Sequence, residues 1–223
     1  MSVRTTARRP VLPLHPSRGG TVSAVDLSGI WRATAADETL RRTFHLPDFD
    51  DDGWETLRVP GHWTEVPALS DETSVLYRHR FEHSLPADIG GRSWLELDGL
   101  FYQGDVWLDG EYLGDTEGYF IRHAFDVTEA LLGRREHELA VEVNCAPAGA
   151  HSKRRGLLGV FEGGDDLVPS GNPGGIWAPV RLRHTGPVRI HGVRAICLEA
   201  NPTRAVVGVR AMLEASSPRT VHV

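Results

Sequence analysis

Cysteine is scarce in this 223-residue sequence, which contains only Cys145 and Cys197. One disulfide is allowed, but two such distant cysteines exclude a scaffold built on disulfides and are typical of reduced core residues. The sequence also lacks any apolar run near the ~20 residues that a membrane-spanning helix needs. Its longest basic block is Lys153–Arg155 and its net charge is -6. We therefore expect neither a nucleic acid nor an anionic membrane as a partner.

The N-terminal segment lacks the apolar stretch that defines a signal peptide. It carries several arginines and is interrupted by Pro10, Pro13 and Pro16. We predict a disordered leader over residues 1–25 and a cytoplasmic location.

Motifs for catalysis and for metal or nucleotide binding are missing as well. There is no G-x-S-x-G motif and no glycine loop for phosphate, and His79 and His83 would not converge on a strand. The acidic run Asp48–Gly53 matches the first half of an EF-hand loop, but Val59 stands where the loop needs a glutamate. Pairs of neighbouring acids on exposed loops are typical of solvated surface. We predict no catalytic residue, no metal site and no cofactor.

Alternation of period two is the dominant pattern. Apolar and polar side chains alternate in residues 75–83, 137–143 and 205–213, as they do in strands with one buried face. Asp109–Gly110 lies between two apolar-rich runs and favours a type I′ hairpin turn. With 24 Gly, 14 Pro and no long helical period, the sequence predicts an all-β protein built as an antiparallel β-sandwich.

The strands fall into two series. The first fills a sandwich over residues 26–185, and Gly186–Pro187 then punctuates the chain. A second series starts at Val188, but the remaining residues are too few for a sandwich that needs ~100. We predict that residues 186–223 are part of a truncated second domain and that the chain is the front piece of a longer protein.

Four stretches carry a family resemblance, namely "DLSGIWRA" (26–33), "DDGWETLRVPGHW" (51–63), "VWLDGEYLG" (106–114) with "EGYF" and "FDVT" after it, and "NPGGIWAPVRL" (172–182). In this order they resemble the N-terminal sugar-binding domain of glycoside hydrolase family 2, which includes β-galactosidases, β-glucuronidases and β-mannosidases. The resemblance implies a jelly-roll sandwich of the galactose-binding-domain type, followed by the first strands of an immunoglobulin-like domain. It also implies a later (β/α)₈ barrel, whose two glutamates hydrolyse terminal β-glycosidic bonds with retention.

The resemblance makes this chain the non-catalytic, carbohydrate-recognising domain, with a β-glycoside and the missing C-terminal barrel as its partners. It implies that the tip Asp115, Glu117 and Tyr119 faces the barrel and the sugar. Sugar rings stack on aromatic faces, so the aromatic candidates are Trp63, Trp107, Tyr119, Phe120 and Trp177, although such residues on strands are usually core. We predict substrate contacts at Asp115, Glu117, Tyr119, Trp63, Asn172 and Trp177. The loop between Pro147 and Gly175 is predicted to line or cover part of the pocket.

Two other functions stay open. A free-standing carbohydrate-binding module would have measurable sugar affinity without a barrel, whereas a structural interaction domain would bury all its aromatics. The kind of sugar and the oligomeric state are not decided by the sequence.

Overall fold

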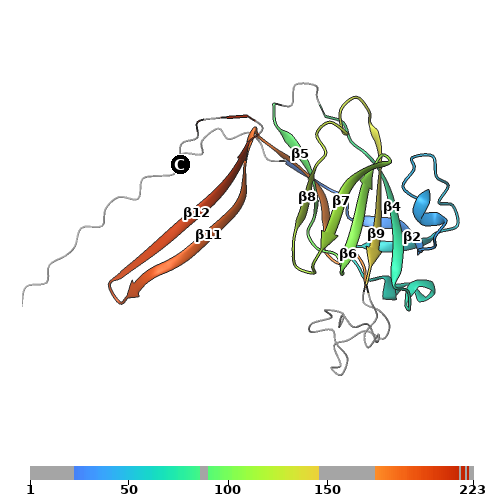
Figure 1. Cartoon of the computed structure of the whole chain (residues 1–223), viewed down its shortest axis with the longest axis horizontal. Helices are drawn as coiled ribbons and strands as arrows, with labels where there is room; N and C mark the ends of the chain where they lie inside the picture. Colours follow the sequence, from blue (N-terminus) through green and yellow to red (C-terminus); the bar gives the residue numbers. More distant parts are fainter. Residues whose placement is uncertain (1–22, 86–89, 146–173, 216, 219, 221–223) are drawn as a thin grey trace, which may run out of the picture.

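The computed structural model describes residues 23–85, 90–145, 174–215, 217–218 and 220. The described residues form antiparallel strands and three short 3-10 helices, η1 (Leu40–Arg42), η2 (Trp63–Glu65) and η3 (Pro67–Leu69). The prediction of an all-β sandwich is confirmed (Figure 1). None of the helices in the described part of the chain has the length and apolar character needed to cross a membrane.

Two sheets make the sandwich. The larger has six strands in the order β3-β2-β4-β9-β6-β7, which are β2 (Gly29–Ala35), β3 (Glu55–Val59), β4 (Ser74–Glu82), β6 (Gln103–Leu108), β7 (Glu111–Glu117) and β9 (Glu136–Asn144). The smaller has four strands in the order β1-β10-β5-β8, which are β1 (Ser23–Asp26), β5 (Arg92–Leu97), β8 (His123–Asp126) and β10 (Val180–Thr185). The first and last strands of the sandwich, β1 and β10, are thus direct neighbours.

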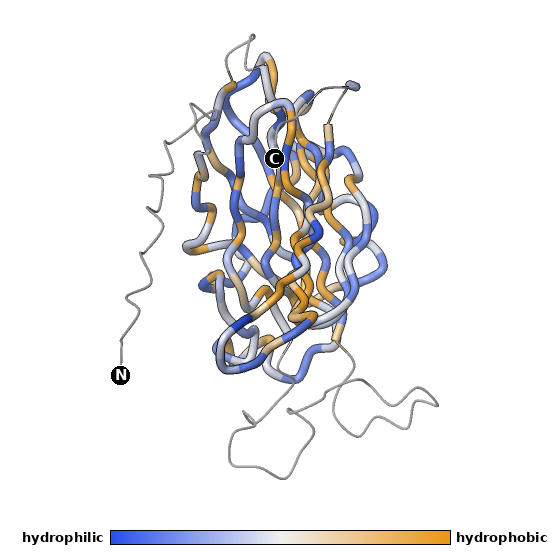
Figure 2. Tube along the Cα trace, turned by 90° about the vertical axis from the view of Figure 1, so that its left-hand side faces the viewer, coloured by the Kyte–Doolittle hydropathy of each residue, from blue (hydrophilic) through white to orange (hydrophobic). Residues whose placement is uncertain are grey.

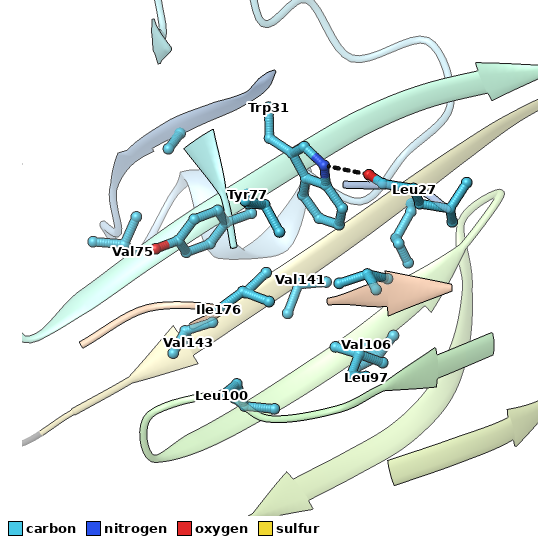
Figure 3. Packing of buried hydrophobic residues seen from close by; sticks show 14 of the residues in the cluster. Leu27, Trp31, Val75, Tyr77, Leu97, Leu100, Val106, Val141, Val143 and Ile176 are labelled. Atoms are coloured by element: carbon cyan, nitrogen blue, oxygen red, sulfur yellow. Dashed lines mark hydrogen bonds between the residues drawn. The ribbon is translucent and has the colours of Figure 1, made fainter. Parts of the chain in front are cut away.

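The core lies between the two sheets, as the alternation predicts. Val75 and Tyr77 on β4 pair with Val143 and Val141 on β9, and all four side chains are fully buried. They belong to the same buried cluster as Leu97 of the smaller sheet (Figure 3). Burial of apolar side chains between the inner faces of two sheets supplies most of the favourable free energy of folding.

Behind the larger sheet lies a buried ionic cluster. The alternation places Arg78 on the face of β4 that points away from the core, where a charged side chain is expected to be solvated. Residues 36–54 cover this face instead, and the Arg78 side chain is 0% exposed. Its Nε donates to Asp51 Oδ2 at 3.0 Å, and its guanidinium also pairs with Glu138 on β9. The acidic run that resembles half an EF-hand loop thus supplies Asp51 as a partner for arginine.

The hairpin between β6 and β7 has the predicted turn. Asp109 has φ 54° and Gly110 has φ 87°, so both central residues adopt the left-handed conformation that a type I′ turn requires. Asp109 also fastens the turn to β9, because its carboxylate accepts the backbone N–H of Glu138 at 2.8 Å and meets Nδ1 of His137 at 2.8 Å.

A second hairpin, β11 (Val188–Asn201) and β12 (Arg204–Ala215), extends away from the sandwich (Figure 1). The apolar residues along one side of β11 have even numbers at first, then odd numbers, then even numbers again. Each change coincides with a register shift, at His191 and at Leu198, so these residues stay on one side of the hairpin. Directly opposed residues share a face, so the apolar pairs are Val188–Ala215, Ile190–Leu213, Val193–Ala211, Ala195–Val209, Cys197–Val207 and Ala200–Ala205. This face is exposed, with Val193 at 62% and Val209 at 68%.

Cys197 lies on this exposed face, whereas Cys145 is buried. The expectation that both cysteines are core residues is therefore correct only for Cys145. Along the described strands, hydrophobic and hydrophilic stretches are interspersed (Figure 2). The assignment of residues 186–223 to an immunoglobulin-like domain stays a prediction.

Two stacked imidazoles join the sheets next to the second hairpin. His83 follows β4 and His184 belongs to β10, with ring centroids 4.9 Å apart and ring planes 12° from parallel. Ser93 Oγ lies 2.8 Å from His184 Nδ1, while Nε2 of both histidines is buried without a hydrogen-bond partner among the described residues. Burial lowers the pKa of both histidines, and for His83 the charges of His184 and His137 lower it further.

This pair should make the fold sensitive to acid. A histidine whose pKa is lower in the folded than in the unfolded chain binds fewer protons when the chain is folded. The stability that depends on it is therefore complete above 6.5, the pKa in the unfolded chain, and decreases as the pH falls below that value. His184→Gln should therefore lose less stability than the wild type between about pH 7.5 and about pH 5.5 in urea titrations. His191→Gln, at a histidine that is 61% exposed, is the control. Equal pH slopes for wild type and His184→Gln would contradict the prediction.

Candidate functional site

Five aromatic residues gather at one end of the sandwich, and we call them the aromatic cluster: Phe101, Tyr102, Tyr119, Phe120 and Trp177. They come from three connections that are distant in sequence, the β5–β6 connection, the β7–β8 connection and the segment before β10. The cluster therefore exists only in the folded chain.

The rings of the cluster contact one another in a row. Tyr119 lies 4.3 Å from Phe101 and 5.0 Å from Tyr102 between ring centroids. Phe120 meets Trp177 at 5.4 Å, with the planes at 75°. Trp177 Nε1 donates to the carbonyl oxygen of Tyr119 at 3.0 Å, which holds the two connections together. Phe120 is 72% exposed, so its phenyl face is open to solvent.

The backbone around the cluster is held by close approaches. A β-bridge joins Phe101 to Gly175, with the Phe101 N–H donating at 2.8 Å. A Cβ on Gly99 would lie 2.8 Å from the Trp177 ring, so only glycine lets that ring pack there. Gly118 has φ +110°, a conformation that favours glycine, and its N–H donates to the Tyr102 carbonyl at 3.0 Å.

Polar groups border the cluster on β7. The Tyr102 hydroxyl donates to Glu117 Oε1 at 2.6 Å, and this hydrogen bond raises the pKa of Tyr102. Burial raises the pKa of Tyr119 to about 12. Both phenols are therefore neutral at physiological pH and act as hydrogen-bond donors, while Glu117 offers acceptor oxygens at the surface.

The structure separates the six predicted contact residues. It brings Tyr119 and Trp177 together in the cluster and places Glu117 at its border. Asp115 is exposed on β7, on the same face as Glu117 but opposite Asp105 and outside the cluster. Asn172 lies outside the described residues, as does most of the loop between Pro147 and Gly175.

Trp63, the sixth, is 0% exposed and lies beneath the cluster. A Cβ on Gly174 would collide with the Trp63 ring, so the indole fills the space under the segment that carries Trp177. In this position Trp63 supports the cluster and has no surface to offer a ligand.

Phe101 and Tyr102 were missed by the sequence reasoning, and Phe120 was a candidate only by its residue type. Both missed residues lie in the motif-rich stretch 97–128, directly before β6. Two adjacent aromatics directly before a strand were the available signal. Among the described residues, no three His, Cys, Asp or Glu side chains are grouped so that they would hold a metal ion.

Comparisons with known proteins agree on one family. Residues 64–166, a little under half of the chain, match the family model of the "Glycosyl hydrolase 2 galactose-binding domain-like" family. A β-glucuronidase of Formosa agariphila is 29% identical over 111 residues, which are 44% of this chain and 11% of the relative. A β-mannosidase B of Emericella nidulans is 34% identical over 86 residues, which are 38% of this chain and 10% of the relative. The matched part thus spans about a tenth of the length of these curated relatives.

Solved structures show the same fold. A β-glucuronidase from glycoside hydrolase family 2 superposes with a TM-score of 0.65 at 22% identity, over 88% of this chain and 22% of that one. The Bacteroides uniformis β-glucuronidase superposes with a TM-score of 0.66 at 18% identity, over 89% of this chain and 23% of that one. Residues 64–166 are therefore similar to the galactose-binding-like domain of glycoside hydrolase family 2, and the described residues share the fold of these solved structures.

Proposed function

We propose that this chain is the non-catalytic, carbohydrate-recognising N-terminal domain of a β-glycosidase that hydrolyses terminal β-glycosidic bonds with retention. The family match and the names of the relatives, β-glucuronidase and β-mannosidase, support the class of enzyme. The single observation that carries sugar recognition is the aromatic cluster, because it presents an exposed aromatic ring beside polar groups at a sheet end.

The cluster has the two kinds of group that a sugar needs. The apolar face of a pyranose ring packs on an aromatic ring, and Phe120 offers such a ring to solvent. Sugar hydroxyls can donate hydrogen bonds, and Glu117 with the Tyr102 hydroxyl oxygen supplies acceptors at the border of the cluster.

We also propose that the cluster faces the catalytic barrel of the longer enzyme. Support comes from the residues flanking the loop that was predicted to line the pocket. Tyr102 N–H donates to Asn144 O at 3.0 Å, and Trp63 N–H donates to Gly174 O at 3.0 Å. The described residues that flank this loop, Asn144 and Gly174, therefore lie beside the cluster.

Phe120→Ala should weaken sugar binding by about tenfold, because one lost stacking contact is worth up to about 1.5 kcal/mol. Titration calorimetry of the whole chain with galactose, glucuronate and mannose measures this. Tyr112→Ala is the matched control, since Tyr112 is an exposed aromatic on β7 outside the cluster, at 55% exposure. In the complete reading frame, Phe120→Ala should also raise KM with kcat little changed.

The same titrations separate the alternatives. Binding that is strong in this chain and unrelated to KM in the longer protein would favour a free-standing carbohydrate-binding module. No affinity for any of the sugars, together with an unchanged KM in Phe120→Ala, would leave a structural interaction domain and refute the proposal.

A further inference from the structure

The aromatic cluster continues into a charged groove on the outer face of the smaller sheet. The groove has a volume of about 750 Å³, and Phe120 and Trp177 form its edge. Its other charged and polar lining residues are Glu96, Asp98, Arg122, Arg183, Arg189 and His191. We call this space the arginine groove.

Strand alternation explains why charges line this groove. On β5, Leu95 and Leu97 point into the core, so Glu96 points outward. Arg181 is directly opposite Glu96 on β10, and Arg183 lies two residues further on the same face. The outer face of the sheet is therefore a mixture of carboxylates and guanidinium groups, while its inner face is apolar.

The second hairpin supplies the other wall. Arg189 on β11 pairs with Glu214 on β12, with its NH2 group 2.8 Å from Oε2, and its guanidinium lies over the Trp94 ring of β5 at 3.1 Å. Arg92 on β5 also pairs with Glu214, at 3.2 Å. These contacts tie the base of the hairpin to the sheet and hold the wall in place.

Ion pairs inside the groove orient its arginines. Arg183 donates from Nε to Glu96 Oε2 at 2.8 Å, and Arg122 donates from Nε to Asp98 Oδ1 at 2.6 Å. The Glu96 side chain is only 6% exposed, so it is a fixed anchor. Among the described residues, the terminal amino groups of Arg183 donate no hydrogen bond. A guanidinium held at Nε keeps these donors for a second carboxylate.

We propose that the arginine groove binds a sugar acid, as one ring of an oligosaccharide whose neighbouring ring stacks on Phe120. This inference rests on the proposed function, because it extends the same carbohydrate site. A sugar acid has one carboxylate for the guanidinium groups and several hydroxyls for Glu96 and Asp98. A phosphate group has no hydroxyls for those acids and carries more negative charge toward them, and a neutral sugar leaves the free Arg183 donors unused.

The test uses the whole chain and two disaccharides, a β-linked glucuronate–glucose disaccharide and neutral cellobiose. Titration calorimetry should show the acidic disaccharide binding about tenfold more tightly, the strength expected of one charge-assisted bidentate contact. Arg183→Gln should remove this preference, so that the acidic disaccharide binds no more tightly than cellobiose. Arg135→Gln is the matched control, since that arginine is 76% exposed and pairs with Glu82 elsewhere on the surface.

Circular dichroism and urea unfolding would confirm that Arg183→Gln is folded. Equal affinities for the two disaccharides would overturn the inference, and so would a preference that survives in Arg183→Gln. In either case the proposed function stands if Phe120→Ala still weakens the binding of both disaccharides. Absence of binding by either disaccharide would also overturn it, and the proposed function would then be judged on KM in the longer protein.

Discussion

Arg78→Met should lower the free energy of unfolding by about 3–5 kcal/mol, the range expected when one partner of a buried ion pair is removed. The Arg78 side chain is fully buried and pairs with Asp51, whose side chain is 3% exposed, and with Glu138, which is 8% exposed. Methionine fills most of the volume but leaves both carboxylates without this partner. Burial raises the pKa of Glu138 against the lowering effect of Arg78 and Arg80.

Arg78 also holds the segment that covers this face of the sheet. Its guanidinium donates to the backbone carbonyls of Phe44, Leu46 and Phe49, the last two at 3.1 and 3.2 Å. It also lies over the Phe49 ring at 5.1 Å. Removing it leaves buried carbonyl groups unpaired, and each such group adds to the cost. Residues 36–54 should therefore exchange their amide hydrogens faster in Arg78→Met.

Arg80→Met provides the matched control, because Arg80 pairs with the same two carboxylates at 3.1 Å from a side chain that is 58% exposed. An exposed pair contributes about 0–1 kcal/mol, so its loss should be small in the same urea titration. Similar losses for the two variants would show that the pairing is worth the same on the surface as in the interior. That result would contradict the account of Arg78 given above.

The sequence predicted the sandwich because alternation reports directly on burial. Val75, Tyr77, Val141 and Val143 have the positions that their period assigns, and the turn at Asp109 follows from the conformations that its two residues allow. Alternation says which face a residue is on, but it does not say what covers that face. The burial of Arg78 depends on residues 36–54, an irregular segment without any period.

The candidate site was less accessible to sequence reasoning. Tyr119 and Trp177 were predicted, but their partners Phe101 and Tyr102 come directly before β6, where aromatic residues are usually core. Whether an aromatic ring is buried or exposed depends on the loops that pack over it. Trp63 shows the difference, because its position beside Gly174 is set by a contact between residues more than a hundred positions apart.

Trp63→Ala should be the second strongly destabilising change, with a loss of about 3–5 kcal/mol in the free energy of unfolding. The indole is fully buried against the chain at Gly174. Alanine would leave a cavity the size of most of an indole, and the surrounding segments are held by backbone hydrogen bonds such as Gly61 N–H to Ile176 O at 2.9 Å. These bonds limit the collapse that would otherwise reduce the cost.

A comparison with Trp177→Ala distinguishes a residue that supports the fold from a residue that contacts the sugar. Trp177 is only half-buried and contacts the exposed Phe120 ring, so its loss should cost less stability and weaken sugar binding more directly. Urea unfolding and titration calorimetry on both variants give the two quantities side by side. If Trp63→Ala kept the wild-type urea midpoint yet lost sugar affinity, Trp63 would be a ligand contact that opens to the surface. If it unfolds early, as its burial predicts, Trp63 supports the fold, and the sugar affinity of Trp177→Ala then tests whether Trp177 contacts the ligand.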